Sequence, residues 1–217
     1  MNKSSKLALL IIGVVLIADQ ALKIWVKTYM FIGESSYTHW GWAIKQFQIA
    51  FTENPGMAFG WKLPGSTGKI LLSVFRLIAI GFLGWYVFRA SKKGEHIGFV
   101  SSLALILAGA VGNMIDSTFY GMIFSDSGYQ ANAVAQIFPP EGGYAPILQG
   151  KVVDMLYFPI IDTYLPDWFP FSAGKHFVFF SPIFNIADAA VTCGVFTILI
   201  FQKRFFRGRK QEETKIN

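Results

Sequence analysis

The chain has 217 residues, of which 53% are hydrophobic and only 15% are charged, with a formal net charge of +6. Soluble domains usually carry about 25% charged residues, so this composition excludes an ordinary soluble globular domain. The single cysteine, Cys193, excludes an intramolecular disulfide and a cysteine-based metal site, and the histidines at 39, 96 and 176 lack the spacing of metal ligands. We therefore expect no metal and no other cofactor.

Four apolar runs are long enough to cross a bilayer, because a spanning helix needs roughly 20 mostly apolar residues. In chain order they cover about residues 7–27, 70–88, 97–119 and 177–202. The first run follows two lysines, as a cleavable signal peptide would, but no small-residue cleavage site comes after it. We interpret it as a retained anchor. The sequence therefore predicts an all-α membrane protein, a four-transmembrane-helix bundle forming one integral membrane domain over residues 1–217.

Basic residues predict the orientation of this bundle. They gather in three short segments: before the first run, between the second and third, and after the fourth. Such segments are cytoplasmic by the positive-inside rule, so both termini are expected inside the cell. The segments of about 29–68 and 120–176 are then outside. The basic and aromatic tail after residue 201 suits anionic lipid headgroups, so we expect membrane lipids as partners and no nucleic acid.

The two outer segments contain more than plain linkers. Residues 47–61 begin with a β-like run that leads into the turn sequence Asn54-Pro55-Gly56. In the second segment, residues 126–150 are rich in glycine, proline, alanine and glutamine and predict a loop. Residues 152–158 are strongly apolar again, and we expect them to return to the bilayer surface.

Several polar residues interrupt the apolar runs. A carboxylate at the centre of a spanning helix costs about 2.5–3.5 kcal/mol, so such residues should face the bundle interior and are candidates for function. Asp19 and Lys23 are four residues apart, share one helix face and predict an ion pair with a mainly structural role.

Two further runs each carry an amide and a carboxylate three residues apart, which places both on one helix face. The third run contains Asn113 and Asp116, near its outer end. The fourth contains Asn185 and Asp188, with Asp188 about eleven residues inside the run counted from residue 177. A later start of the helix at Ser181-Pro182 is the alternative and would make Asp188 less deep. Each pair could serve chemistry or a helix–helix hydrogen bond.

Two carboxylates in a partly desolvated site share one proton and titrate as a coupled unit. The ionised member can take a proton from water while the protonated member polarises a carbonyl. A nearby asparagine can orient a carboxylate or stabilise an oxyanion. Peptide hydrolysis is one function that this arrangement supports. The alternative is a small proton-coupled carrier or lipid-binding scaffold with Asp19, Asp116 and Asp188 as a relay.

Five sequence blocks in order resemble lipoprotein signal peptidase, also called signal peptidase II. Together they span most of the chain, and their order is more specific than any one block. The blocks are Asp19-Gln20 with Lys23, Asn54-Pro55-Gly56-Met57-Ala58-Phe59, Gly112-Asn113-Met114-Ile115-Asp116, Val152-Val153-Asp154 and Phe184-Asn185-Ile186-Ala187-Asp188.

The resemblance implies an aspartic endopeptidase that removes signal peptides from diacylglyceryl-modified prolipoproteins, just before the lipidated cysteine. It implies a multi-pass protein of the bacterial cytoplasmic (inner) membrane with its active site near the outer face. It also implies a small extracytoplasmic β-cradle, here within about residues 29–68, that lies on the membrane and grips the substrate. We expect a monomer.

By the family's pattern the catalytic aspartates map onto Asp154 and Asp188. Composition alone would not have selected Asp154, which is in a predicted loop, and Asp116 becomes a supporting residue. The resemblance also implies that Asp19 and Lys23 support the fold and substrate contact. The remaining residues implied to bind substrate or to line the site are Asn54, Gly56, Asn113, Asn185 and Ala187.

The chain departs from the family's pattern in two places. Ser117 stands where the family usually has arginine, and Lys151 and Arg76 are the candidates to replace that charge. Asp116 and Asp154 are also further apart than is usual in the family, which implies an inserted outer loop at about 120–150. We expect this loop to form either a lid or substrate-contact element, or a surface excursion without a role in the site.

Overall fold

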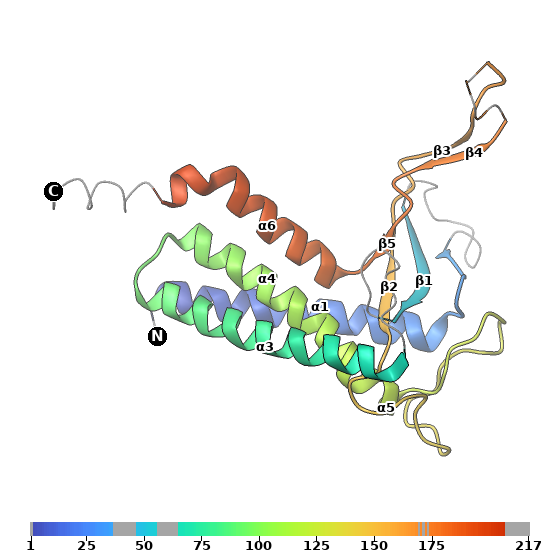
Figure 1. Cartoon of the computed structure of the whole chain (residues 1–217), viewed down its shortest axis with the longest axis horizontal. Helices are drawn as coiled ribbons and strands as arrows, with labels where there is room; N and C mark the ends of the chain where they lie inside the picture. The colour runs from blue at the N-terminus through green and yellow to red at the C-terminus, as the bar shows by residue number, and fades with distance from the viewer. Residues whose placement is uncertain are drawn as a thin grey trace.

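The computed structural model describes residues 2–36, 47–55, 65–168, 170, 172 and 174–206. Long helices dominate the part that it describes (Figure 1). By length and composition, four segments can cross a membrane. The corresponding helices are α1 (Lys3–Tyr29), α3 (Gly65–Lys92), α4 (Ile97–Ile115) and α6 (Ile186–Phe205).

Helix α4 is the centre of the bundle, because α1, α3 and α6 all pack against it. It approaches α6 closely through glycine: a Cβ atom on Gly109 would lie 2.1 Å from the backbone oxygen of Ala187. Small residues allow this kind of backbone contact between membrane helices. The other three helices expose large apolar side chains outward, including Ile17, Phe75 and Ile200, as expected of surfaces that face lipid.

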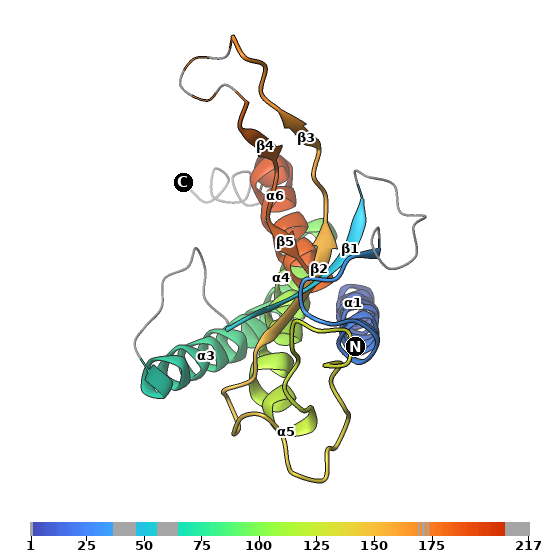
Figure 2. The same ribbon diagram turned by 90° about the vertical axis from the view of Figure 1, so that its right-hand side faces the viewer.

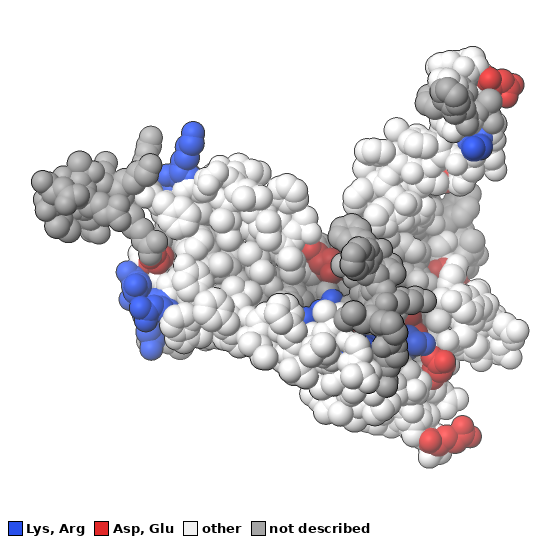
Figure 3. All heavy atoms as spheres, viewed as in Figure 1, with Lys and Arg blue, Asp and Glu red and all other residues white. Residues whose placement is uncertain are grey.

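Charged residues are distributed as a membrane-spanning bundle requires. Figure 3 shows an uncharged band between a basic cluster at one end of the molecule and the charged groups around a central hollow and the outer loops. Arg89, Lys92 and Lys93 belong to the end of α3 and the turn that follows it. This distribution of charge is consistent with the predicted orientation, in which the basic segments are cytoplasmic.

A three-stranded antiparallel sheet stands at the opposite end of the bundle (Figure 1). Its order is β1 (Gln48–Asn54), β2 (Val152–Tyr157) and β5 (Ile183–Phe184). Thr52 pairs with Asp154, and Leu156 pairs with Phe184. The side chains of Val153 and Met155 are fully buried beneath it. Strand β2 therefore pairs on one side with β1, which precedes α3, and on the other with β5, which precedes α6.

Two more strands, β3 (Ile161–Tyr164) and β4 (His176–Phe179), form a separate antiparallel hairpin. This hairpin leaves the main sheet between β2 and β5 and extends beyond α6, away from the bundle (Figures 1 and 2). It occupies part of the run 177–202 that the sequence predicted to be helical.

The last helix begins at Ile186, later than the predicted start near residue 177. Hydrophobicity alone does not distinguish a strand from a helix between residue 177 and Ile186, because a short apolar run suits both. The start is set by Asn185, whose side-chain oxygen accepts from the backbone N–H of Asp188 at 2.8 Å. The Asp188 side chain in turn accepts from the backbone N–H of Asn185 at 3.3 Å, which completes a capping box. Asp188 therefore lies in the first turn of α6 instead of deep within it.

The third predicted run, 97–119, ends differently from a plain helix. Helix α4 stops at Ile115 and continues as a π-helical turn, η1 (Asp116–Tyr120), and a short turn of helix, α5 (Gly121–Ile123). The chain after it returns to this end, where the N–H of Gly150 donates to the carbonyl of Ser117 at 2.8 Å. A Cβ on Gly150 would lie 2.1 Å from the Asp116 carbonyl oxygen, so glycine permits the close return.

The inserted outer loop, about 120–150, is fixed to the bundle by charges. Buried Lys27 of α1 donates to Glu53 of β1 and, at 2.9 Å, to the hydroxyl of Ser127 in the loop. At the end of the loop Lys151 pairs with Glu53 at 2.9 Å and with Asp126 at 2.7 Å. The loop is thus held against α1 and the sheet.

Candidate active site

Asp154 and Asp188 meet at one buried asparagine. The side-chain amide of Asn185 donates to Asp154 at 2.7 Å, and its backbone and side chain form the capping box with Asp188. Asp154 arrives on β2, whereas Asp188 is carried by the first turn of α6. A strand and a helix thus bring two carboxyl groups that are distant in the sequence to one residue.

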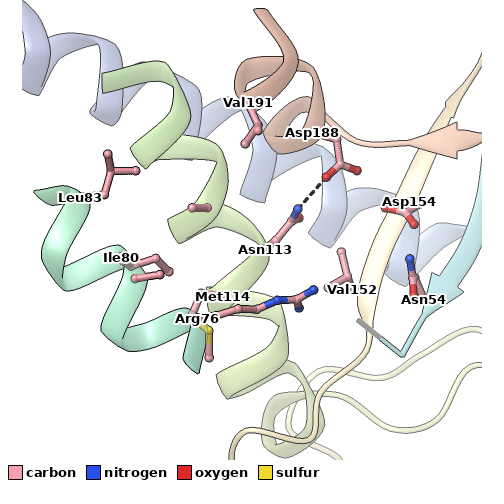
Figure 4. Close-up of a pocket in the computed structure, with 12 residues that line it drawn as sticks. Asn54, Arg76, Ile80, Leu83, Asn113, Met114, Val152, Asp154, Asp188 and Val191 are labelled. Carbon is pink, nitrogen blue, oxygen red and sulfur yellow. Dashed lines mark hydrogen bonds between the residues drawn. The ribbon is translucent and has the colours of Figure 1, made fainter. Parts of the chain in front are cut away.

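A second amide, Asn113 of α4, holds Asp188 from the other side. Its nitrogen donates to Asp188 at 2.8 Å (Figure 4). Its oxygen accepts from Lys23 at 2.9 Å and from Asn185 at 3.1 Å. Because a lysine ammonium can only donate, Lys23 fixes which end of the Asn113 amide faces Asp188.

Both carboxyl groups open into a cavity of about 440 Å³ between α3, α4, α6 and the sheet. Figure 4 shows Asp154 and Asp188 directed into the same space, with Asn54 beside Asp154. Apart from Asn54, Arg76, Asn113 and the two aspartates, the lining is apolar: Ala79, Ile80, Leu83, Ala110, Met114, Val152 and Val191. The residues of the loop at about 120–150 are not among those that line this cavity.

The protonation of Asp154 is set by its surroundings. Burial and the neighbouring Asp188 raise the pKa of the Asp154 carboxyl to about 7, against the opposing effect of the hydrogen bond from Asn185. Asp188, by contrast, accepts from the side-chain amide of Asn113 on α4 and from the backbone N–H of Asn185, the N-cap of α6. It lies in the first turn of α6, where the helix dipole stabilises negative charge. The pair is therefore suited to hold one proton, on Asp154.

Beneath the cavity lies a fully buried ionic network. Lys23 contacts Asp19 at 2.9 Å and Asp116 at 2.8 Å, and none of the three side chains is exposed. Asp116 accepts from the backbone N–H of Val153, next to Asp154, at 3.2 Å. Asp19 accepts from the backbone N–H of Ala187, next to Asp188, at 2.9 Å. The network thus fixes the backbone on which each cavity carboxylate is carried.

The structure places most predicted site residues in this one region. Asn113, Asn185, Asp19, Lys23, Asp116 and Ala187 form the shell described above, and Asn54 lines the cavity. Gly56 lies outside the described residues. Sequence reasoning missed Gln20, which donates to Asp19 at 3.1 Å and to Asp116 at 3.0 Å. Its position next to Asp19 was the available signal.

The two candidates for the charge that Ser117 lacks lie in different surroundings. Ser117 is buried and donates to the backbone oxygen of Asn113 at 3.0 Å, so it contributes no charge. Lys151 is held by Glu53 and Asp126, away from the cavity lining. Arg76 of α3 lines the cavity, and its charge acts on Asp188 (Figure 4).

Known proteins are similar to this chain over most of its length. A family model described as signal peptidase (SPase) II matches residues 11–204. The chain is 47% identical over 200 residues to the lipoprotein signal peptidase of Porphyromonas gingivalis, covering 92% of this chain and 84% of that protein. It is 35% identical over 200 residues to the lipoprotein signal peptidase of Amoebophilus asiaticus, covering 88% and 76%.

Solved structures share the fold. A bacterial membrane enzyme determined by the in meso method at 1.9 Å resolution gives a TM-score of 0.52 at 26% identity, covering 89% of this chain and 90% of that one. A second, determined at 2.3 Å, gives a TM-score of 0.54 at 24% identity, covering 91% and 87%.

Proposed function

This chain belongs to the signal peptidase II family, and from that premise we propose that Asp154 and Asp188 are the aspartate pair with which it hydrolyses its substrates. Family membership makes it a multi-pass membrane protease of lipoprotein processing, which removes signal peptides from prolipoproteins. The observation that carries the proposal is that Asn185 donates to both carboxyl groups, through its side-chain amide to Asp154 and through its backbone N–H to Asp188, at the wall of one cavity.

In the proposed reaction the two carboxyl groups have different roles. Ionised Asp188 takes a proton from a water molecule, and protonated Asp154 donates a hydrogen bond to the oxygen of the scissile carbonyl. The resulting hydroxide attacks the carbonyl carbon and forms a tetrahedral intermediate. The proton on Asp188 then passes to the leaving amide nitrogen as the C–N bond breaks. Asn113 and Asn185 hold Asp188 throughout.

The cavity suits a substrate that arrives within the membrane. Helices α3 and α6 both pack on α4 but make few contacts with each other. The cavity therefore lies between two helices that face lipid. Its apolar wall, including Ile80, Leu83 and Val191, matches a signal peptide helix and the acyl chains of a diacylglyceryl group. Asn54 and Asn113 are placed to bind backbone groups that are released when the substrate helix unwinds.

The distribution of basic residues supports a location for the site. The basic cluster at the far end of α3 is cytoplasmic by the positive-inside rule, so the cavity opens near the outer face of the bacterial inner membrane. A monomer is sufficient for the reaction, because one chain supplies both aspartates. The carrier alternative is less well supported, since Asp19 and Asp116 are both ion-paired with Lys23.

Cleavage by the purified protein tests the substrate assignment. The full-length chain in lipid vesicles is incubated with a diacylglyceryl-modified precursor and, separately, with the same precursor without lipid. We expect the lipidated form to be cut just before its modified cysteine, as mass spectrometry of the products would show, and the other form to be cut far more slowly. Equal cleavage of both forms, or cleavage of neither, would contradict the assignment.

The pH dependence tests the roles of the two carboxyl groups. Because the pKa of Asp154 is raised to about 7, the group keeps its proton below that pH and loses it above. The cleavage rate at saturating substrate is therefore expected to fall as the pH rises through about 7. A rate that stays constant from pH 6 to pH 8 would show that a proton on Asp154 is not required.

A further inference from the structure

The β3–β4 hairpin has a position in the chain that links it to both proposed catalytic residues. The chain leaves β2, which carries Asp154, passes through the hairpin and returns as β5, directly before Asn185. None of the described residues of the hairpin lines the cavity. The surface of the hairpin itself is therefore the feature to consider.

The register of the hairpin gives it one apolar face. Ile161 pairs with Phe179, and Thr163 pairs with Phe177. Opposed residues in an antiparallel pair lie on the same side, and alternate residues along a strand do so too, so these four share a face. Ile161, Phe177 and Phe179 are 48%, 39% and 53% exposed, so nothing in the described chain covers that face.

The other face of the hairpin is more polar. Asp162 pairs with Val178, and Tyr164 pairs with His176, again in register. The ring of His176 lies 2.5 Å from the Asp162 carboxylate, so an ion pair or hydrogen bond occupies this side. The hairpin is thus an amphipathic ribbon with two chemically distinct faces.

Where the hairpin lies indicates what covers its apolar face. It begins at the sheet end of the four membrane-crossing helices and runs across their axes, which is along the plane of the membrane surface (Figures 1 and 2). It extends past α6, whose own outward side chains, such as Phe196 and Ile200, are exposed and apolar. At the tip of the hairpin Trp168 is 78% exposed, and tryptophan is favoured at membrane interfaces.

We propose that the β3–β4 hairpin is a membrane-surface arm, which lies on the bilayer beside α6 with Ile161, Phe177 and Phe179 inserted at the lipid boundary. The arm continues the lipid-facing surface of α6, and its polar face stays toward water. A further consequence rests on the proposed function: by holding the chain between Asp154 and Asp188 at the membrane surface, the arm sets the depth at which Asp154 meets a lipidated substrate.

A scan of three successive residues of β4 tests the arm directly. In a Cys193→Ser background, which removes the chain's only native cysteine, Phe177→Cys, Val178→Cys and Phe179→Cys each receive a spin label. The full-length proteins are placed in lipid vesicles. Collisions of each label with oxygen, which concentrates in lipid, are compared with collisions with a water-soluble nickel complex.

We expect the ratio of these two collision rates to alternate along the strand. Labels at 177 and 179 should favour oxygen, and the label at 178, on the opposite face, should favour nickel. Ile161→Cys on the paired strand provides a second reading of the apolar face and should match 177 and 179, so the test does not depend on one variant. Equal access of nickel to all four labels would overturn the proposal.

A second copy of the chain is the main alternative occupant. If copies covered the apolar face, labels at 177 would approach each other, and their spectra would broaden until labelled protein was diluted with unlabelled protein. That result would also overturn the proposal. Because the spectra report membrane contact without any cleavage, a failure here is distinguishable from a failure of the proposed function.

Discussion

We expect Asp154→Asn and Asp188→Asn each to abolish cleavage of a lipidated precursor, while both proteins still insert and fold. Asparagine is close to aspartate in size, and its one amide oxygen can still accept from Asn185 at position 154 and from Asn113 at position 188. It cannot take a proton from water or supply an acidic one. General acid–base catalysis contributes about 10²–10⁴-fold, so a loss of at least this order is expected from either change. The measurement is the initial cleavage rate of purified protein in lipid, with the thermal unfolding midpoint recorded for each variant.

Two comparisons make this prediction specific to the pair. Asp126→Asn changes an exposed carboxylate that pairs with Lys151 outside the cavity, and it should leave the rate unchanged. The double variant Asp154→Asn/Asp188→Asn should be no slower than the single variants, because residues that act as one unit are not additive. Near-normal cleavage by either single variant would show that the carboxyl group is not required.

We expect Lys23→Met to destabilise the folded protein strongly. The Lys23 ammonium is fully buried between Asp19 and Asp116, and its removal leaves two buried carboxylates without a counter-charge. Breaking such a buried group by removing one partner costs about 3–5 kcal/mol. A whole protein is stable by only about 5–15 kcal/mol. We therefore expect a large fall in the yield of monodisperse protein and in its unfolding midpoint in detergent.

Matched variants separate the charge from the size of the side chain. Lys203→Met, at the exposed end of α6, should have little effect on stability. Adding Asp19→Asn and Asp116→Asn to Lys23→Met removes the unpaired charges and should recover part of the lost stability. If Lys23→Met unfolds at the wild-type temperature, or if the triple variant is no more stable than Lys23→Met alone, the buried charges do not support the fold as described.

Features that depend on a short stretch of chain could be predicted from the sequence. Spanning helices require long apolar runs in themselves, so the four runs identify the four helices that can cross the membrane. The Asp19–Lys23 ion pair follows from a spacing of four within one helix and is present in the structure. Asn185 and Asp188 also lie together as predicted, although their spacing of three serves a capping box as well as the site.

Features that depend on distant pairing could not be predicted from the residues themselves. Asp154 reaches the site only because β2 pairs with β1, about a hundred residues earlier in the chain, and with β5. The family resemblance supplied Asp154; composition did not. For the same reason the apolar stretch after residue 176 was expected to be helical, whereas pairing with β3 and β2 makes it two strands. Arg76 enters the cavity through helix packing, which no local pattern encodes.

In the proposed mechanism Asp154 carries the proton of a coupled aspartate pair. Infrared spectroscopy of the purified protein in lipid detects this proton, because protonated and ionised carboxyl groups absorb at different frequencies. We expect a protonated-carboxyl band that decreases as the pH rises through about 7, that is missing from Asp154→Asn and that persists in Asp126→Asn. A band that is unchanged by Asp154→Asn, or a wild-type spectrum without this titration, would contradict the claim.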